Sequence, residues 1–254
     1  MINNFIMKII FITLLFSMTA ASLRAQAPNI LFLSQGRIEF EKKLNQHSAI
    51  EGDNGWSELE KKTLSQFKIT YFDLQFTRTK TLYKPGREGT GTSMGWFSEL
   101  PAQENTVYSD LEQGKSISQK KVFEQQFLVQ DTIRRIKWKL TDETRVIAGF
   151  NCRRANAIIM DSLYVVAFYT DEILATGGPE SFSGLPGMIL GVALPHQHVS
   201  WFATKVEAIA VTDNQLTPPQ KGKKTDNAGL KETVGPALKD WGKYAYRSLQ
   251  AIYL

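Results

Sequence analysis

The sequence predicts a mainly β protein of the α+β class, built as a twisted antiparallel sheet or half-barrel meander with a short helix and a C-terminal amphipathic helix. Three observations predict this class. Apolar and polar residues alternate with a period of two along much of the chain, which is typical of half-buried strands. A helical period appears at residues 56–67 and again near the C-terminal end. The regular alternation of strands and helices that builds a parallel sheet is missing.

The N-terminal segment predicts export. Lys8 precedes a mainly apolar run over residues 9–16, which small residues follow. Because about 20 apolar residues are needed to cross a bilayer, we interpret residues 1–25 as a signal peptide, cleaved after Ala25. The cleavage region holds no cysteine that a lipoprotein pathway would acylate. We therefore expect a protein of the periplasm or the cell exterior that is neither a lipoprotein nor membrane-spanning.

Composition and length predict one main domain, exclude an intramolecular disulfide and argue against nucleic-acid binding. Residues 26–211 read as a β-rich domain, 212–227 as a linker and 228–254 as a C-terminal helix. Cys152 is the only cysteine, so no disulfide can form within the chain. The formal net charge of +5 is only mildly basic, and aromatic residues do not alternate with a basic stripe. We expect no nucleic-acid partner and no cofactor.

The expected strands follow one another with short connections. In residues 37–44, Ile38, Phe40 and Leu44 share one face, which Lys42 interrupts. Asp161 and Ser162 form a tight hairpin connection, whereas the glycine-rich residues 85–105 form a loop. The remaining expected strands are residues 70–76, 123–129, 136–140, 145–150, 152–160, 163–169 and a final strand at 199–211.

The C-terminal region predicts a linker and then one helix. Two prolines, Pro218 and Pro219, break the sheet pattern before a group of lysines. Apolar residues then recur at three- and four-residue steps: Leu230, Val234, Leu238, Trp241, Ala245, Leu249 and Ile252. We favour a helix that packs on the sheet. The alternative is a helix that binds a partner or a membrane surface through its basic side, formed by Lys231, Lys239, Lys243 and Arg247.

The hexapeptide Gly184-Leu185-Pro186-Gly187-Met188-Ile189 resembles the motif that names the GLPGLI family of exported Bacteroidota proteins, with Met188 in place of leucine. Further segments are similar to family landmarks in the expected order: Val107-Tyr108, Phe127-Leu128-Val129, Trp138-Lys139-Leu140, Ile147 to Cys152, Ala155, Tyr169 to Ile173, and Gly178-Pro179. The resemblance implies an exported protein of unknown biochemical activity. It also implies a partner, since genes of this family often accompany TonB-dependent outer-membrane receptors.

Backbone geometry accounts for the motif. Glycine reaches positive φ without steric cost and proline presets φ near −65°, so the chain can turn sharply while Leu185, Met188 and Ile189 enter the core. We favour this structural role. In the alternative interpretation, residues Gly184, Leu185, Pro186 and Gly187 bind a ligand, with exposed amides holding an anion or a peptide terminus.

Two other candidate sites rest on thiol and imidazole chemistry. We interpret Cys152 as a small buried residue, with a reactive thiol or an intermolecular disulfide as alternatives. His196 and His198 would share one face of a strand and could bind one metal ion, although two ligands do not complete a site. His47, the third histidine, is remote in sequence.

Acidic residues provide the remaining candidates. Asp171 and Glu172 are neighbours that would project to opposite faces of a strand. Asp142, Glu143, Asp161 and Glu180 lie in turn-like contexts, where we expect a solvated or capping role. We therefore expect a non-enzymatic binding or accessory protein, and the family resemblance implies a role in TonB-dependent uptake. One alternative is a peptide or glycan hydrolase, which requires two of these six acids to meet in one cleft. The other alternative is metal binding through His196 and His198.

Overall fold

The structure, a computed structural model, describes residues 32–50, 55–91 and 100–254. The chain divides into two compact units, residues 1–31 and residues 32–254, and every described residue belongs to the second. The predicted signal peptide and part of the predicted 85–105 loop lie outside the described residues. Within the described part of the chain, no helix is long and apolar enough to span a membrane.

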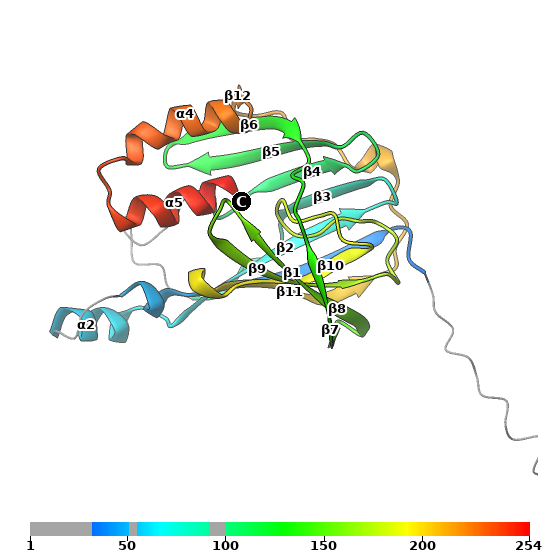
Figure 1. Ribbon diagram of the computed structural model, residues 1–254, viewed down its shortest axis with the longest axis horizontal. Coiled ribbons are helices and arrows are strands. Elements are labelled where there is room, and N and C mark those ends of the chain that lie inside the picture. The colour runs from blue at the N-terminus through cyan, green and yellow to red at the C-terminus, as the bar shows by residue number, and fades with distance from the viewer. Residues whose placement is uncertain (1–31, 51–54, 92–99) are drawn as a thin grey trace, which may run out of the picture. The chain divides into compact units, whose positions relative to one another are not determined.

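A single open sheet dominates residues 32–254, and twelve strands are described in it, in the order β12-β6-β5-β4-β3-β2-β1-β11-β10-β9-β8-β7 (Figure 1). The first group of strands is β1 (Gly36–Asn45), β2 (Phe67–Phe76), β3 (Lys80–Pro85), β4 (Thr106–Asp110), β5 (Lys115–Val122) and β6 (Gln125–Thr132). The second group is β7 (Lys139–Ile147), β8 (Phe150–Ile159), β9 (Leu163–Thr170), β10 (Met188–Leu194) and β11 (Val199–Glu207). The mainly β prediction is confirmed. The sheet consists of two antiparallel meanders, joined where β1 pairs with β11.

Short helices and one further strand complete the described elements: η1 (Gln46–Ala49), α2 (Gly55–Thr63), η2 (Pro195–Gln197), η3 (Asp213–Gln215), β12 (Lys223–Thr225), α4 (Asn227–Leu238) and α5 (Lys243–Tyr253). The short helix predicted over residues 56–67 is confirmed as α2. The predicted final strand ends at Glu207, and the segment interpreted as a linker contributes β12, which pairs in parallel with β6.

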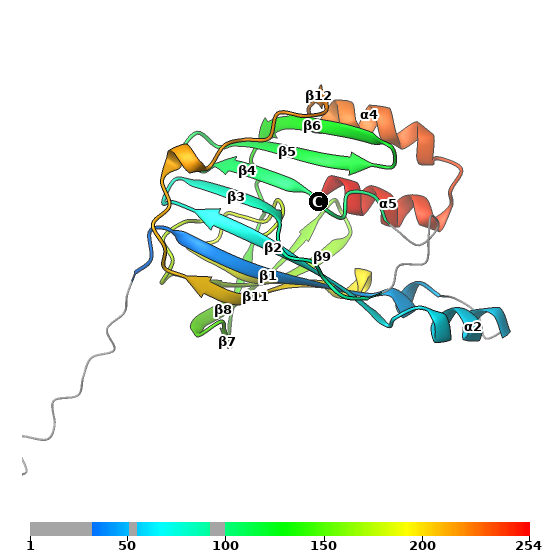
Figure 2. The same ribbon diagram turned by 180° about the vertical axis from the view of Figure 1, so that it is seen from behind.

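The predicted C-terminal helix is two helices, α4 and α5. Gly242 has a φ of +56°, which an α-helix does not allow, and it separates them. Leu230, Val234 and Leu238 of α4 pack with Ile252 of α5 in a core that also holds these residues of the sheet and its loops: Ala102, Val122, Phe127 and Val129. Figures 1 and 2 show both helices beside β5 and β6. The predicted packing on the sheet is confirmed, except that Trp241 is about half exposed and contacts the Phe123 ring instead.

Strand β1 shows how alternation builds the main core. Ile38 and Phe40 are fully buried, and Lys42, the residue that interrupts their face, is buried beside them. Strands β9 and β10 are mostly apolar and add a second set of buried side chains, among them Tyr169 and Val192. Because hydrophobic burial stabilises by about 25 cal/mol per Å² of apolar surface, this inner face supplies the main driving force for folding.

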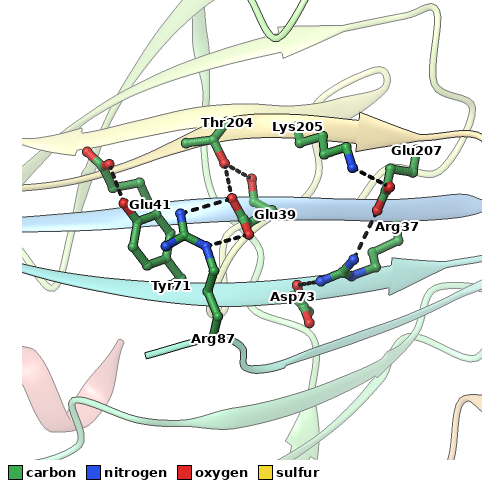
Figure 3. A network of polar contacts seen from close by, with 9 residues as sticks. All are labelled: Arg37, Glu39, Glu41, Tyr71, Asp73, Arg87, Thr204, Lys205 and Glu207. Atoms are coloured by element: carbon green, nitrogen blue, oxygen red, sulfur yellow. Dashed lines mark hydrogen bonds and ion pairs between the residues drawn. The ribbon is translucent and has the colours of Figure 1, made fainter. Parts of the chain in front are cut away.

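The outer face of β1, β2 and β11 carries a network of ion pairs and hydrogen bonds (Figure 3). Arg37 of β1 donates to Asp73 of β2 at 2.7 Å and to Glu207 of β11 at 2.9 Å, so one guanidinium links three strands. Glu39 accepts a hydrogen bond from Arg87 at 3.0 Å. The other members of the network are Glu41, Tyr71, Thr204 and Lys205. This network lies opposite the apolar face and holds the register of the central strands.

We predict that Arg37→Ala lowers the free energy of unfolding by about 1 kcal/mol, since it removes two charge-assisted hydrogen bonds at once. The matched control is Arg153→Ala, which removes an arginine with one partner, Asp171, and with 61% of its side chain exposed. Urea denaturation of both variants measures the difference. Equal effects would show that the network does not hold the central strands.

Candidate functional site

A groove of about 1110 Å³ opens between the sheet, the C-terminal helices and the loop that carries the hexapeptide motif. Its walls come from residues 131–136, which are the end of β6 and the segment after it, from the β8–β9 turn, from Ser183 and Gly184, and from α4 and α5. Apolar and polar side chains share these walls. The groove therefore gathers segments that are far apart in sequence and includes the first glycine of the motif.

A smaller chamber of about 40 Å³ lies next to the groove. It is lined by the inner side of β4, β5 and β6 together with residues of the loop between β9 and β10, including Glu180 and Ser181. Groove and chamber share part of their walls, namely Leu111, Asp131, Thr132, Ile133, Arg134, Ser183, Asn227 and Tyr253. The two spaces are therefore adjacent.

Several buried polar atoms around these spaces have no hydrogen-bond partner. Four belong to residues that line the groove: Arg134 Nη1, Ser183 Oγ, Gln250 Oε1 and Tyr253 Oη. Ser181 Oγ, in the chamber wall, is a fifth. A buried polar group without a partner costs about 1–3 kcal/mol, so such groups are rare unless a ligand or water satisfies them. Their concentration here marks this wall as the candidate binding surface.

Glu180 is a buried carboxylate of the chamber wall, and the expectation that it is solvated or a capping residue is wrong. It is only 4% exposed, and its φ of +50° turns the loop so that the side chain enters the interior. Asn105 donates to its Oε2 at 2.9 Å, and Lys42 Nζ lies 3.9 Å from its Oε1. The turn context predicted an exposed side chain, but the strands folded around this loop cover it.

Lys42 and Lys120 are the two buried lysines near Glu180. Lys42 donates to the Gln103 carbonyl at 3.0 Å and lies 5.2 Å from the Trp201 ring centre, and its burial lowers its pKa. Lys120 donates to the Ile252 carbonyl at 2.9 Å, which ties β5 to α5. Burial lowers the pKa of Lys120 to about 8, with Glu180 opposing the shift. Both lysines are therefore held by the structure in an environment that disfavours their charge.

The hexapeptide turns as predicted. Gly184 and Gly187 have φ values of +88° and +136°, and Leu185, Met188 and Ile189 are buried, which confirms their predicted place in the core. Both glycine amides donate to backbone carbonyls, that of Gly184 to Thr176 and that of Gly187 to Leu185. These bonds favour the structural role of the motif. Ligand binding by the motif itself stays a prediction, in which Gly184 takes part as a residue of the groove wall.

Cys152 is fully buried, which agrees with the interpretation as a small core residue. Burial, with a smaller contribution from Glu172, raises the pKa of its thiol to about 12. The thiolate is the nucleophilic form, so this environment suppresses reactivity.

His196 and His198 lie in an exposed turn formed by η2 and the residue after it, not in a strand. In a strand the two imidazoles would share a face, but His198 has a φ of +52°, which breaks that geometry. Among the residues that the structure describes, no group of three or more histidines, cysteines or acids is placed to hold a metal ion. The metal site stays a prediction without a third ligand in the described chain.

The other candidate acids occupy separate surroundings. Glu143 pairs with Arg154 at 2.6 Å, and Asp171 pairs with Arg153 at 3.0 Å. Glu172 accepts a hydrogen bond from the Asn151 amide at 3.3 Å, Asp142 is exposed, and Asp161 lines the groove. A hydrolase would need two of these groups, or one of them with Glu180, to converge on a substrate, and it stays a prediction.

Sequence reasoning missed Arg134, Ser183 and Lys120 as site residues. Lys42 left a visible signal, because it interrupts an otherwise apolar strand face. Lys120 carries the same signal on β5, where it lies between the buried residues Ser118 and Val122. Arg134 follows a strand and its sequence context resembles that of a surface arginine, so only the contact with α5 reveals that its guanidinium is partly buried.

Comparison with known families gives one short match. A family model described as "Protein of unknown function (Porph_ging)" matches residues 157–191, from the end of β8 to β10. The segment includes the hexapeptide motif, and the match is consistent with a Bacteroidota family. None of the curated proteins matches this chain.

Two solved structures resemble the chain in fold. "Structure of PNGF-II in P21 space group" is 15% identical with a TM-score of 0.49, over 80% of this chain and 33% of that chain. "Structure of PNGF-II in C2 space group" is 14% identical with a TM-score of 0.50, over 79% of this chain and 32% of that chain. The chain thus spans about a third of the length of these proteins, and at this identity the likeness concerns the fold alone.

We predict that Gly187→Ala destabilises the protein by several kcal/mol more than Gly184→Ala. Both positions have positive φ, but a Cβ at Gly187 would lie 2.0 Å from the Thr170 carbonyl oxygen, whereas at Gly184 the nearest atom is 3.9 Å away. Both variants lose about 1 kcal/mol because alanine disfavours a positive φ. The difference between their free energies of unfolding therefore measures the cost of the close approach to Thr170. Thermal and urea unfolding measure it. Equal losses would show that the backbone at Thr170 moves aside.

We predict that Lys120 makes stability rise with pH between about 8 and 10.5. In this window the unfolded chain, with an ordinary lysine pKa of 10.5, binds more protons than the folded chain, whose Lys120 pKa is about 8. From pH 7 to pH 10 the free energy of unfolding should therefore increase by up to about 3 kcal/mol more in the wild type than in Lys120→Met. Lys121→Met, at the exposed neighbouring position, should keep the wild-type pH profile. A Lys120→Met profile parallel to that of the wild type would contradict the prediction.

Proposed function

We propose that this chain is an exported, non-enzymatic binding protein that takes its ligand in the groove between the sheet, the motif loop and the C-terminal helices. The observation that carries the proposal is the set of buried polar atoms without partners in the groove wall, from Arg134, Ser183, Gln250 and Tyr253. A ligand group that enters this wall would satisfy them, and so would offset their cost.

The size and lining of the groove support the same proposal. Its volume of about 1110 Å³ is slightly above the range for small-molecule sites, which are commonly about 300–1,000 Å³, so it can hold a ligand of that size. Such sites combine apolar walls with a few polar groups that fix orientation. Here Leu111, Ile136 and Leu249 are among the apolar residues of the wall.

The buried charges support binding over catalysis. Glu180 is engaged with Asn105 and lies close to Lys42, and both buried lysines donate to backbone carbonyls. Groups held in this way keep loop, strand and helix together. They therefore preorganise the chamber wall and do not present a free acid, base or nucleophile to the groove.

Location and partner belong to the same proposal. The apolar run at residues 9–16 supports export to the periplasm or the cell exterior. The resemblance of the 184–189 hexapeptide to the GLPGLI motif supports an accessory role beside a TonB-dependent receptor or another envelope protein. In that role the groove would hold the ligand that the receptor transports.

We predict that the mature protein, isolated gently from its own envelope fraction, carries a bound small molecule in native mass spectrometry. Thr176→Trp should lose this mass, because Thr176 is an exposed residue of the groove wall and an indole would fill the space. Thr144→Trp places the same side chain on β7, away from the groove, and should retain it. A wild-type protein without any retained ligand would argue against the proposal, and retention by Thr176→Trp would exclude the groove.

A further inference from the structure

The groove has two chemically different parts. Leu111, Ile136, Met160 and Leu249 are half-buried and give it an apolar wall. The polar atoms without partners belong to residues on the side shared with the chamber, or next to it on α5. An apolar wall that ends in unsatisfied polar groups matches a ligand that is itself amphipathic.

Arg134 is the charged group of the polar part. Its Nη2 donates to the carbonyl of Tyr253, and its Nη1 is buried without a partner. No carboxylate among the described residues forms an ion pair with it. Arg134 as a whole is half-buried, but Nη1 is shielded from solvent, and a shielded donor of a charged group is costly to leave without a partner. An anion bound in the groove would offset this cost.

Asp131, the acid nearest in sequence, does not serve as the counter-ion of Arg134. Asp131 lines the same wall, but its carboxylate accepts hydrogen bonds from the Thr132 amide at 2.7 Å and from the Asn227 amide and side chain at 3.1 and 2.8 Å. These bonds fix it against the start of α4. Its acceptors are therefore committed, while the donor capacity of Arg134 Nη1 remains unused.

Ser183 adds a neutral donor to the same shared wall. It is 6% exposed, its hydroxyl has no partner, and it lines both groove and chamber, as Arg134 does. Its own carbonyl accepts a hydrogen bond from the Trp138 indole at 2.9 Å, so the backbone that carries the hydroxyl is held in position. A guanidinium and a hydroxyl on a fixed backbone are suitable donors for an anionic head group.

We propose, on the basis of the binding function above, that the ligand is an amphiphile with an anionic head group, a carboxylate or a phosphate. The head group accepts hydrogen bonds from Arg134 and Ser183, and the apolar body lies along the wall that contains Leu111, Ile136, Met160 and Leu249. Arg135 and Lys231 also line the groove with exposed side chains. Their charges add long-range attraction for an anion without fixing its position.

The test is calorimetric titration of the folded, delipidated protein with dodecanoate, dodecyl phosphate, dodecanol and acetate. The anionic amphiphiles should bind at least about tenfold more tightly than dodecanol, since hydrogen bonds to charged groups are worth about 1.5–3 kcal/mol. Acetate, which lacks the apolar body, should not bind detectably. The stronger of the two anionic probes identifies the head group as a carboxylate or a phosphate.

Two variants of the groove wall test where the anionic head group binds. Ser183→Ala removes a hydroxyl that has no partner in the fold, so it should bind dodecanoate or dodecyl phosphate three- to tenfold more weakly with unchanged thermal stability. Arg134→Gln should remove the preference over dodecanol, whereas Arg78→Gln, at an exposed arginine that lines neither the groove nor the chamber, should keep it.

Equal binding of dodecanol and the anionic probes, or equal effects of Arg134→Gln and Arg78→Gln, would overturn this inference. The binding function would still stand if the envelope-purified protein retained a neutral ligand that Thr176→Trp loses. A retained peptide would likewise contradict the inference that the ligand is an anionic amphiphile. It would identify the groove as a peptide-binding site. If the envelope-purified protein retained nothing and none of the four probes bound, both proposals would fail together.

Discussion

The pairing of β1 with β11 joins the two meanders into one sheet, and the arrangement of the interior depends on its register. The two strands are about 160 residues apart in sequence, yet Lys42 lies directly opposite Trp201 and Ile38 opposite Val206. A slip of one residue would turn Ile38 and Phe40 to solvent and bring the ion pairs of Arg37 inward. Burial on one face and ion pairs on the other therefore select the same register.

This register also decides which charges are buried. Lys42 enters the core between aromatic rings, and the loop that carries Glu180 closes over it with a carboxylate. Removing either group would leave the other buried without compensation, which is more costly than the pair itself. The chamber is thus a product of the fold's central pairing, and the groove beside it forms where α4 and α5 cover β5 and β6.

Local patterns predicted much of the fold because burial on a strand repeats every two residues. Residues 37–44, 163–169 and the 161–162 hairpin are as expected, and so are the buried side chains of the hexapeptide. The prediction failed where a neighbour distant in sequence decides the outcome. Lys223–Thr225 looked like a linker because its strand exists only through pairing with β6, and the C-terminal helix is divided at Gly242, a conformation that apolar periodicity does not reveal.

By itself, the sequence determined the mainly β class, the turn chemistry of residues 184–189 and the absence of a disulfide within the chain, since each depends on residue type and short-range spacing. The site depends on contacts across the chain, and only the tertiary structure decided it. Glu180 is buried because distant strands cover its turn, and Arg134 lines the groove with an unused donor because α5 folds back against it. Sequence spacing records neither event, because burial of a charged side chain is set by the elements that pack over it.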